Sequence, residues 1–142
     1  MPHMSADFAD AGLECVMETA LYVSDLRRAA AFYRDKLGLR MIREFENDRG
    51  IALRVGPSIL LLFRADVTRN AGEFLSHGCT GQGHAAFRVP PEQIPLWRER
   101  LRQRGVPIET EIVFGEGNPP SLYFRDPDGN SLEIAVASIW PD

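Results

Sequence analysis

Residues 18–23, Glu-Thr-Ala-Leu-Tyr-Val, and residues 84–89, His-Ala-Ala-Phe-Arg-Val, are two strand-like segments that each lead into an amphipathic helix pattern. The first helix pattern ends at Gly38 and the second at Gly105. The offset from residue 18 to residue 84 is close to half of the 142-residue chain. A repeat of that size indicates two copies of one supersecondary unit, and it is therefore the feature that decides the fold.

Length, composition and charge restrict the class of protein. With 142 residues, of which 44% are hydrophobic, the chain is typical of one compact domain. A net charge of −4 without a block of like charges predicts no nucleic-acid partner, and no apolar run approaches the ~20 residues that span a bilayer, so we expect no membrane partner. The two cysteines lack paired spacing, which favours reduced thiols in a cytoplasmic protein.

Turn residues and hydrophobic periodicity divide the chain into a disordered tail, residues 1–13, and one domain, residues 14–142. Module one, residues 16–64, is predicted to contain a strand, a helix and three strands, at 16–23, 26–37, 39–45, 51–55 and 58–63. Module two, residues 84–137, repeats that order at 84–89, 90–104, 106–113, 121–125 and 131–136. The connector between them, residues 65–83, is longer than most loops and is therefore expected to be functional or a crossover.

Period-2 alternation predicts which side chains leave the helix-packed face of each strand. In the last strand Leu132 and Ile134 are expected to pack against the helix, so Glu133 points to the opposite, concave face. The same argument places several other polar side chains on that kind of face: Glu18, His84, Arg88, Ser121, Tyr123 and Arg125. Glu18, His84 and Glu133 are all metal-ligand types.

Three motifs, in order, carry a resemblance to a known family. They are the segment 23–39 around Val23-Ser24-Asp25-Leu26 and Leu37-Gly38-Leu39, the segment Gly83-His84-Ala85-Ala86-Phe87, and the segment 125–133 that begins Arg125-Asp126-Pro127-Asp128-Gly129-Asn130. Over residues 16–137 the chain resembles the glyoxalase / bleomycin resistance / extradiol dioxygenase superfamily, the vicinal oxygen chelate fold. The resemblance implies an α+β fold in which two tandem βαβββ modules form a cupped mixed sheet, with helices on the outer face.

The resemblance also implies a metal site. Glu18 falls where the family most often has a histidine, and His84 and Glu133 fall at two further ligand positions, whereas Leu60 stands at a fourth position where glyoxalase I enzymes carry a ligand. One imidazole and two carboxylates suit a divalent ion, and Mn, Zn, Ni, Fe and Mg all stay open. In many short members a second subunit completes the cup, so we expect a homodimer in which Glu18 of one chain joins His84 and Glu133 of the other. The alternative is a cup that closes within one chain.

Other residues are assigned around that site with their structural alternatives. Tyr123 and Ser121 are expected beside the metal, with Tyr123 catalytic together with Glu18 and Glu133; the alternative is an ordinary solvated strand face. Arg88 and Arg125 are candidates for holding an anionic group of a small-molecule substrate, because a guanidinium pairs bidentately with carboxylate or phosphate. Both arginines equally suit surface pairs with nearby acids.

Two functions from different classes follow. The first is a divalent-metal-dependent enzyme acting on a small oxygen-chelating substrate, as an isomerase, lyase, transferase or ring-cleaving dioxygenase. Lyase or isomerase chemistry is favoured over extradiol cleavage, because His3 lies in the predicted tail and His84 is a candidate ligand, so only His77 is left as a pocket histidine. A fosfomycin-type role is weakened separately, because residues 114–120 lack the Lys/Ser-rich loop usual in such members. The second is a metal-free, bleomycin-resistance-like protein that binds a planar drug or metabolite, with Trp140 as an aromatic without an evident core role.

Overall fold

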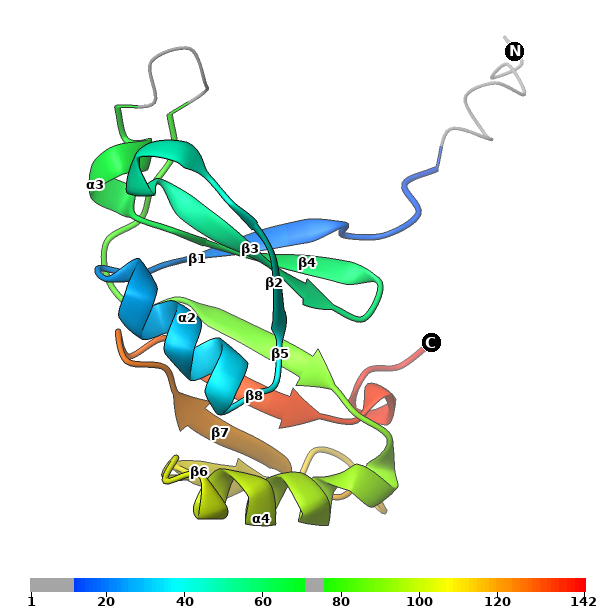
Figure 1. Ribbon diagram of the computed structural model, residues 1–142. Coiled ribbons are helices and arrows are strands. Elements are labelled where there is room, and N and C mark those ends of the chain that lie inside the picture. The colour runs from blue at the N-terminus through cyan, green and yellow to red at the C-terminus, as the bar shows by residue number, and fades with distance from the viewer. Residues whose placement is uncertain (1–11, 71–75) are drawn as a thin grey trace, which may run out of the picture.

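The computed structural model describes residues 12–70 and 76–142, and it contains two four-stranded sheets, one from each module (Figure 1). The first sheet has the order β1-β4-β3-β2 and the second the order β5-β8-β7-β6. In each sheet the first strand of the module runs parallel to the last, and the other neighbours are antiparallel. Their bounds are β1 Glu18–Tyr22, β2 Arg40–Glu44, β3 Gly50–Val55, β4 Ser58–Phe63, β5 His84–Arg88, β6 Thr110–Ile112, β7 Ser121–Arg125 and β8 Ser131–Ala135. The tandem βαβββ prediction is confirmed.

Each sheet is packed against the helix of its own module. Helix α2, Leu26–Asp35, contacts β2, β3 and β4, and helix α4, Ile94–Gln103, contacts β7 and β8. The Asp25 carboxylate caps α2 by accepting a hydrogen bond from the Arg28 amide at 3.0 Å. Gly38, with φ of +73°, lets the chain leave that helix in a left-handed conformation. The N-terminal cap and the glycine stop that the sequence predicts for this helix are therefore both observed.

Three local predictions need correction. The helix expected from Pro90 begins as the 3-10 turn η2, Pro91–Gln93, before α4. The strand expected over 106–113 is reduced to β6, Thr110–Ile112, because the Val106 side chain turns into the core and Pro107 has no amide to donate. The connector, of which residues 71–75 lie outside the described ranges, begins with a short helix, α3 Ala65–Thr68. The remaining short helices are η1 Glu46–Asp48 and η3 Ala137–Ile139.

One hydrophobic core joins the two modules. It contains residues from β1, α2, β3 and β4 and from α4, β7 and β8, and its largest fully buried side chain is Tyr33 of α2. The Tyr33 hydroxyl donates to Asp126 Oδ2 at 2.8 Å, and Asn130 Nδ2 donates to the Tyr22 carbonyl at 3.1 Å. The turn between β7 and β8 is thus hydrogen-bonded to the first module.

The predicted tail, residues 1–13, falls almost entirely outside the described ranges. No helix within the described ranges is both long and apolar enough to cross a membrane.

Candidate metal centre

His84 and Glu133 come together on the open face of the second sheet. His84 begins β5 and Glu133 lies in the middle of β8, its parallel neighbour, and His84 Nε2 is 3.5 Å from Glu133 Oε1. The other ring nitrogen, Nδ1, is 2.9 Å from the Ser131 carbonyl oxygen. Because a carbonyl oxygen only accepts, Nδ1–H donates there, and Nε2 is the ring atom that faces Glu133. A hydrogen bond from the second ring nitrogen to a carbonyl is the arrangement that orients metal-binding histidines.

The Glu133 carboxylate is buried without full hydrogen bonding. Glu133 is only 6% exposed, and its Oε2 atom has no hydrogen-bond partner among the described residues. A buried carboxylate oxygen without a partner carries an uncompensated desolvation cost, which a bound cation removes. The burial and the orphaned oxygen therefore fit a metal ligand.

Tyr123 of β7 lies beside this pair, opposite Glu133 in the ladder, and Ser121 precedes it by two residues on the same face. The Tyr123 ring stacks on the His84 ring with centroids 6.4 Å apart, and its hydroxyl interacts with Glu133. Burial, and then the neighbouring carboxylate, raise the pKa of Tyr123, so the phenol is held as a neutral donor. Ser121 is 1% exposed, and its hydroxyl has no partner in the described ranges. Tyr123 therefore has hydrogen-bonding capacity beside His84 and Glu133, and Ser121 offers a hydroxyl two residues further along the same face of β7.

Glu18 does not join the other two candidate ligands within one chain. It is exposed at the start of β1, an edge strand of the first sheet, and it lines a cleft of about 620 Å³ together with Ala86 and Arg88 of β5. Among the described residues no group of three or more His, Cys, Asp or Glu side chains is close enough to hold an ion. A three-ligand centre with Glu18 therefore needs a further chain or a rearrangement.

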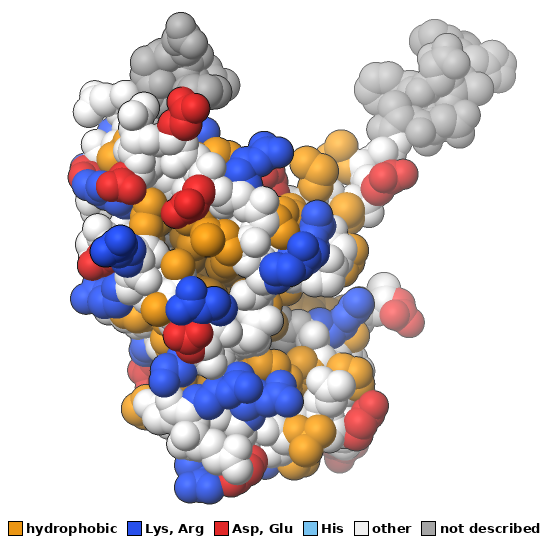
Figure 2. All heavy atoms as spheres, viewed as in Figure 1, with side chains coloured by type: hydrophobic (Ala, Val, Ile, Leu, Met, Phe, Trp, Pro, Cys, Tyr) orange, Lys and Arg blue, Asp and Glu red, His pale blue; other side chains and the backbone are white. Residues whose placement is uncertain are grey.

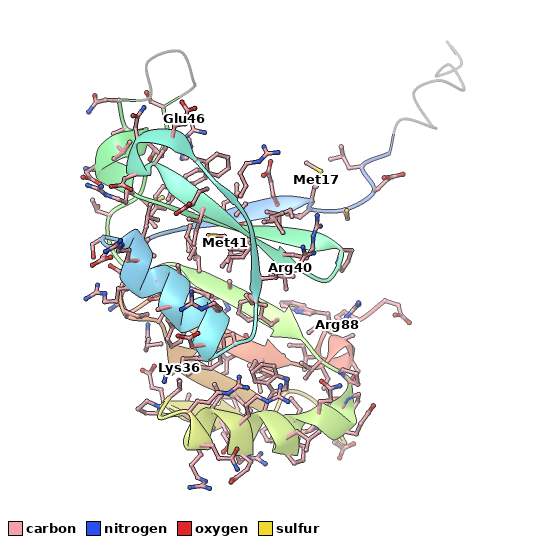
Figure 3. All side chains as sticks on the ribbon, in the orientation of Figure 1. Met17, Lys36, Arg40, Met41, Glu46 and Arg88 are labelled. Carbon is pink, nitrogen blue, oxygen red and sulfur yellow. The ribbon has the colours of Figure 1, made fainter. Side chains whose placement is uncertain are left out.

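The two candidate arginines differ in their surroundings. Arg125 Nε donates to Glu109 Oε2 at 2.6 Å, and the guanidinium holds the pKa of Glu109 below its usual value. Arg125 thus makes the surface pair that was its alternative role. Arg88, labelled in Figure 3 at the end of β5, is exposed on the cleft and forms no ion pair with a described residue.

A hydrogen-bonded pair that joins the first module to the connector was not predicted. Tyr22 Oη lies 2.6 Å from His77 Nδ1, and the His77 amide donates to the Thr68 carbonyl. Burial chiefly raises the pKa of Tyr22. Alternation already put Tyr22 on the same face as Glu18, but His77 comes from the aperiodic connector, so no local pattern could bring the two together.

A model of the Glyoxalase/Bleomycin resistance protein/Dioxygenase superfamily matches residues 16–134. A crystal structure of lactoylglutathione lyase from Agrobacterium tumefaciens superposes with a TM-score of 0.83 at 33% identity, over 91% of this chain and 98% of that one. Glutathione transferase FosA of Serratia marcescens is 29% identical over 127 residues, which are 89% of this chain and 84% of that protein.

Two further similarities are more limited. Metallothiol transferase FosB of Bacillus licheniformis is 35% identical over 57 residues, 40% of this chain, and the match spans only 37% of that protein. A structure of the fosfomycin resistance protein FosX from Listeria monocytogenes, complexed with Mn(II) and a dihydroxypropylphosphonic acid, has a TM-score of 0.64 at 20% identity and covers 87% of this chain and 90% of that one. The latter shows likeness of fold alone.

Proposed function

Since the chain belongs to the glyoxalase/bleomycin resistance/dioxygenase superfamily, we propose that it is a divalent-metal-dependent enzyme acting on a small substrate that chelates the ion through two oxygens. The observation that carries the proposal is the pair of His84 and Glu133, in which the buried carboxylate has an orphaned Oε2 and the imidazole is oriented toward it by the Nδ1 hydrogen bond. Its relatives include a lyase and a glutathione transferase, which support enzymatic activity of this class.

The ligand set of the proposal is His84 and Glu133 of one chain and Glu18 of a second copy, in a homodimer with two equivalent sites. Glu18 is exposed on an edge strand, and its neighbours Val16 and Met17 are 75% and 64% exposed. Exposed apolar side chains beside an unpaired strand edge favour coverage by another chain. We propose that the partner covering them places its own His84 and Glu133 within reach of this carboxylate.

The proposed reaction divides into what the ion supplies and what the protein supplies. A bound Mn, Zn, Ni, Fe or Mg ion supplies Lewis acidity toward two vicinal oxygens of the substrate. Tyr123 donates a hydrogen bond from its neutral phenol to a substrate oxygen, and Ser121 offers a second donor on the same strand. The carboxylates of Glu18 and Glu133 accept and return a proton at the carbon beside those oxygens.

Within this class we propose lyase or isomerase chemistry rather than extradiol ring cleavage. Ring cleavage in this family relies on a pocket histidine for acid–base work. Among the described residues the only histidine outside the metal site is His77, and it is hydrogen-bonded to Tyr22 of the first module. A transferase reaction of the kind named for FosA uses the same ion and is a second form of the proposal.

Metal content is the test. Untagged protein is dialysed against chelator, reloaded separately with Mn, Zn, Ni, Fe and Mg, and analysed by mass spectrometry. We expect about one ion per chain, lost in Glu133→Gln and His84→Ala and retained in the control Glu116→Gln, which makes the same carboxylate-to-amide change in an exposed loop. Both site variants should keep a native circular dichroism spectrum.

Absence of an ion under every loading would contradict the enzyme proposal. It would favour the alternative function, a metal-free protein that binds a planar drug or metabolite. In that case the exposed Trp140, at 76% exposure, is the fluorophore with which to screen aromatic ligands.

A further inference from the structure

Three arginines share the open face of the first sheet. The register pairs Arg40 of β2 directly with Arg54 of β3, and it pairs Arg43 with Ala52. Residues directly opposite each other in a ladder point to the same side of the sheet. Leu53, next to Arg54, is fully buried in the core, so all three arginines lie on the side away from the helix. Figure 3 labels Arg40 at the start of β2.

That side of the sheet is also the side of Glu18. The ladders place Glu18 opposite Ile59, Ile59 opposite Arg54, and Arg54 opposite Arg40, in one row across the four strands. Neighbouring strands are about 4.8 Å apart, so the backbone positions of Glu18 and Arg54 are separated by roughly 10 Å. A candidate metal ligand and a basic pair thus stand at opposite ends of one row.

These arginines are not neutralised by the protein. All three are exposed, and none forms an ion pair with a residue in the described ranges, whereas Arg64, Arg98, Arg102 and Arg125 each have a carboxylate partner. Like charges directly opposite in a ladder destabilise a sheet. A guanidinium pair at that spacing is relieved by an anion, and guanidinium geometry matches carboxylate and phosphate.

Apolar side chains separate the two ends of the row. Ile59 and Leu61 of β4 are half-buried, and Ala52 of β3, which is opposite Leu61, is buried. The face therefore offers a carboxylate at one edge, an apolar floor, and unpaired guanidiniums at the other edge. A ligand that matched all three would be long, apolar in its middle and anionic at its far end.

We propose that Arg40 and Arg54, supported by Arg43, form a binding site for a carboxylate or phosphate group at the end of the substrate remote from the metal. The inference rests on the proposed function, because it assigns the substrate to one class: chelating oxygens at one end, an apolar spacer, and an anion roughly 10 Å away.

The test uses hydroxamates as chelating probes on the Mn-loaded protein, with calorimetry as the readout. Suberic acid monohydroxamate carries a carboxylate at the end of an apolar chain, and its terminal amide is the neutral counterpart. We expect the carboxylate to bind at least about tenfold more tightly than the amide, as for a charge-assisted hydrogen bond. The malonic monohydroxamate, which is too short to reach the arginines, should show no such preference.

Variants assign the preference to the arginines. Arg54→Ala and Arg40→Ala should abolish the carboxylate preference while leaving the affinity for acetohydroxamate unchanged. Arg27→Ala is the matched control, because Arg27 is an exposed arginine of α2 without an ion pair in the described ranges. Equal affinity of the carboxylate and the amide, or an equal loss in Arg27→Ala, would overturn the inference.

A titration of metal-free protein with inorganic phosphate separates this inference from the proposed function. We expect the arginine Nε–H resonances of Arg40 and Arg54 to shift in a nuclear magnetic resonance spectrum, and no shift at either would overturn the anion site. Failure of acetohydroxamate to bind any metal-loaded form would instead overturn the metal-enzyme proposal, and the phosphate shifts would still support the basic site.

Discussion

Glu133 is a carboxylate in a strand whose neighbours, Leu132 and Ile134, are both buried in the core. The strand cannot expose Glu133 to water by turning over, because a change of face would expose those two side chains. The burial of Leu132 and Ile134 therefore fixes the face of the sheet on which Glu133 lies. An ion that binds only the folded protein would offset the desolvation cost of the buried carboxylate and so raise the free energy of unfolding.

Metal removal should therefore lower stability. At a free ion concentration about a hundredfold above the Kd, binding to the native state adds about 2.7 kcal/mol to the free energy of unfolding. We expect chelator to remove that increment from the wild-type protein and to have no effect on Glu133→Gln. Thermal unfolding with and without Mn checks this, and a chelator effect that persists in the variant would contradict the assignment of Glu133.

Tyr33 is the second residue with a strong individual prediction. It is fully buried, its hydroxyl donates to Asp126, and burial raises its pKa far above the usual range, so it stays a neutral donor. Tyr33→Phe removes a buried hydrogen bond to a charged group, and we expect a loss of about 1.5–3 kcal/mol in the free energy of unfolding. Urea denaturation measures it.

Tyr22→Phe is the matched control, since the Tyr22 hydroxyl bonds His77 at a partly exposed position. Its loss should be smaller than that of Tyr33→Phe. Equal losses would mean that the contact of Tyr33 with Asp126 contributes no special coupling between the modules.

At the scale of elements, β3 passes close to β4 at one glycine. A methyl group added at Gly50 would lie 2.5 Å from Phe63 Cδ1 and 2.6 Å from the Leu62 carbonyl oxygen. The carbonyl belongs to the backbone of the neighbouring strand and cannot move aside without breaking the ladder. Gly50 therefore permits the close approach of β3 to β4, on the same face of the sheet as Arg54.

Gly50→Ala should destabilise the protein by about 1–3 kcal/mol through overpacking. Gly12→Ala is the control, because nothing lies within 4 Å of a methyl group there. Chemical denaturation of both variants gives the comparison, and an unchanged Gly50→Ala midpoint would show that the strands separate more easily than their register indicates.

At the scale of the whole molecule, the candidate ligands are divided between the two sheets. His84 and Glu133 belong to the second sheet, and Glu18 belongs to an exposed edge of the first. Figure 2 shows exposed hydrophobic side chains next to Lys and Arg on one face, and the exposed apolar residues of the first module include Met17, Met41 and Ile42. A homodimer would bring the two parts of the site together and cover apolar surface.

Complementation tests that arrangement. Glu18→Ala and His84→Ala should each bind no metal alone, but a mixture that is unfolded and refolded together should regain one intact site per mixed dimer. The site regained combines Glu18 of the His84→Ala chain with His84 and Glu133 of the Glu18→Ala chain. Metal content of the refolded mixture measures it.

A mixture without metal would contradict a site shared between chains and favour a cup closed within one chain. Refolded wild-type protein is the control for recovery, and a mixture of Glu133→Gln with His84→Ala should stay without metal, because both of those ligands belong to one half of the site.

The amino-acid sequence was sufficient for most elements and for the orientation of their side chains. Strands β4 and β7 were predicted with their observed ends, and the alternation of Leu132, Glu133 and Ile134 predicted the face of each residue. Strand ends and side-chain faces depend on residues within a few positions of each other, so they can be predicted from the local sequence. The starts of β6 and α4 were missed, because core packing at Val106 and a tight turn at Pro91 override local periodicity.

What the sequence alone determined is the repeat, the βαβββ order, the superfamily it resembles and the residue types at the ligand positions. Only the tertiary structure decided that His84 Nε2 faces Glu133, that Arg125 is paired with Glu109, and that Glu18 and Arg40 end one row of the first sheet. The physical reason is that distances between strands follow from ladder register and core packing. Those are set by contacts between residues far apart in the chain, which no local pattern specifies.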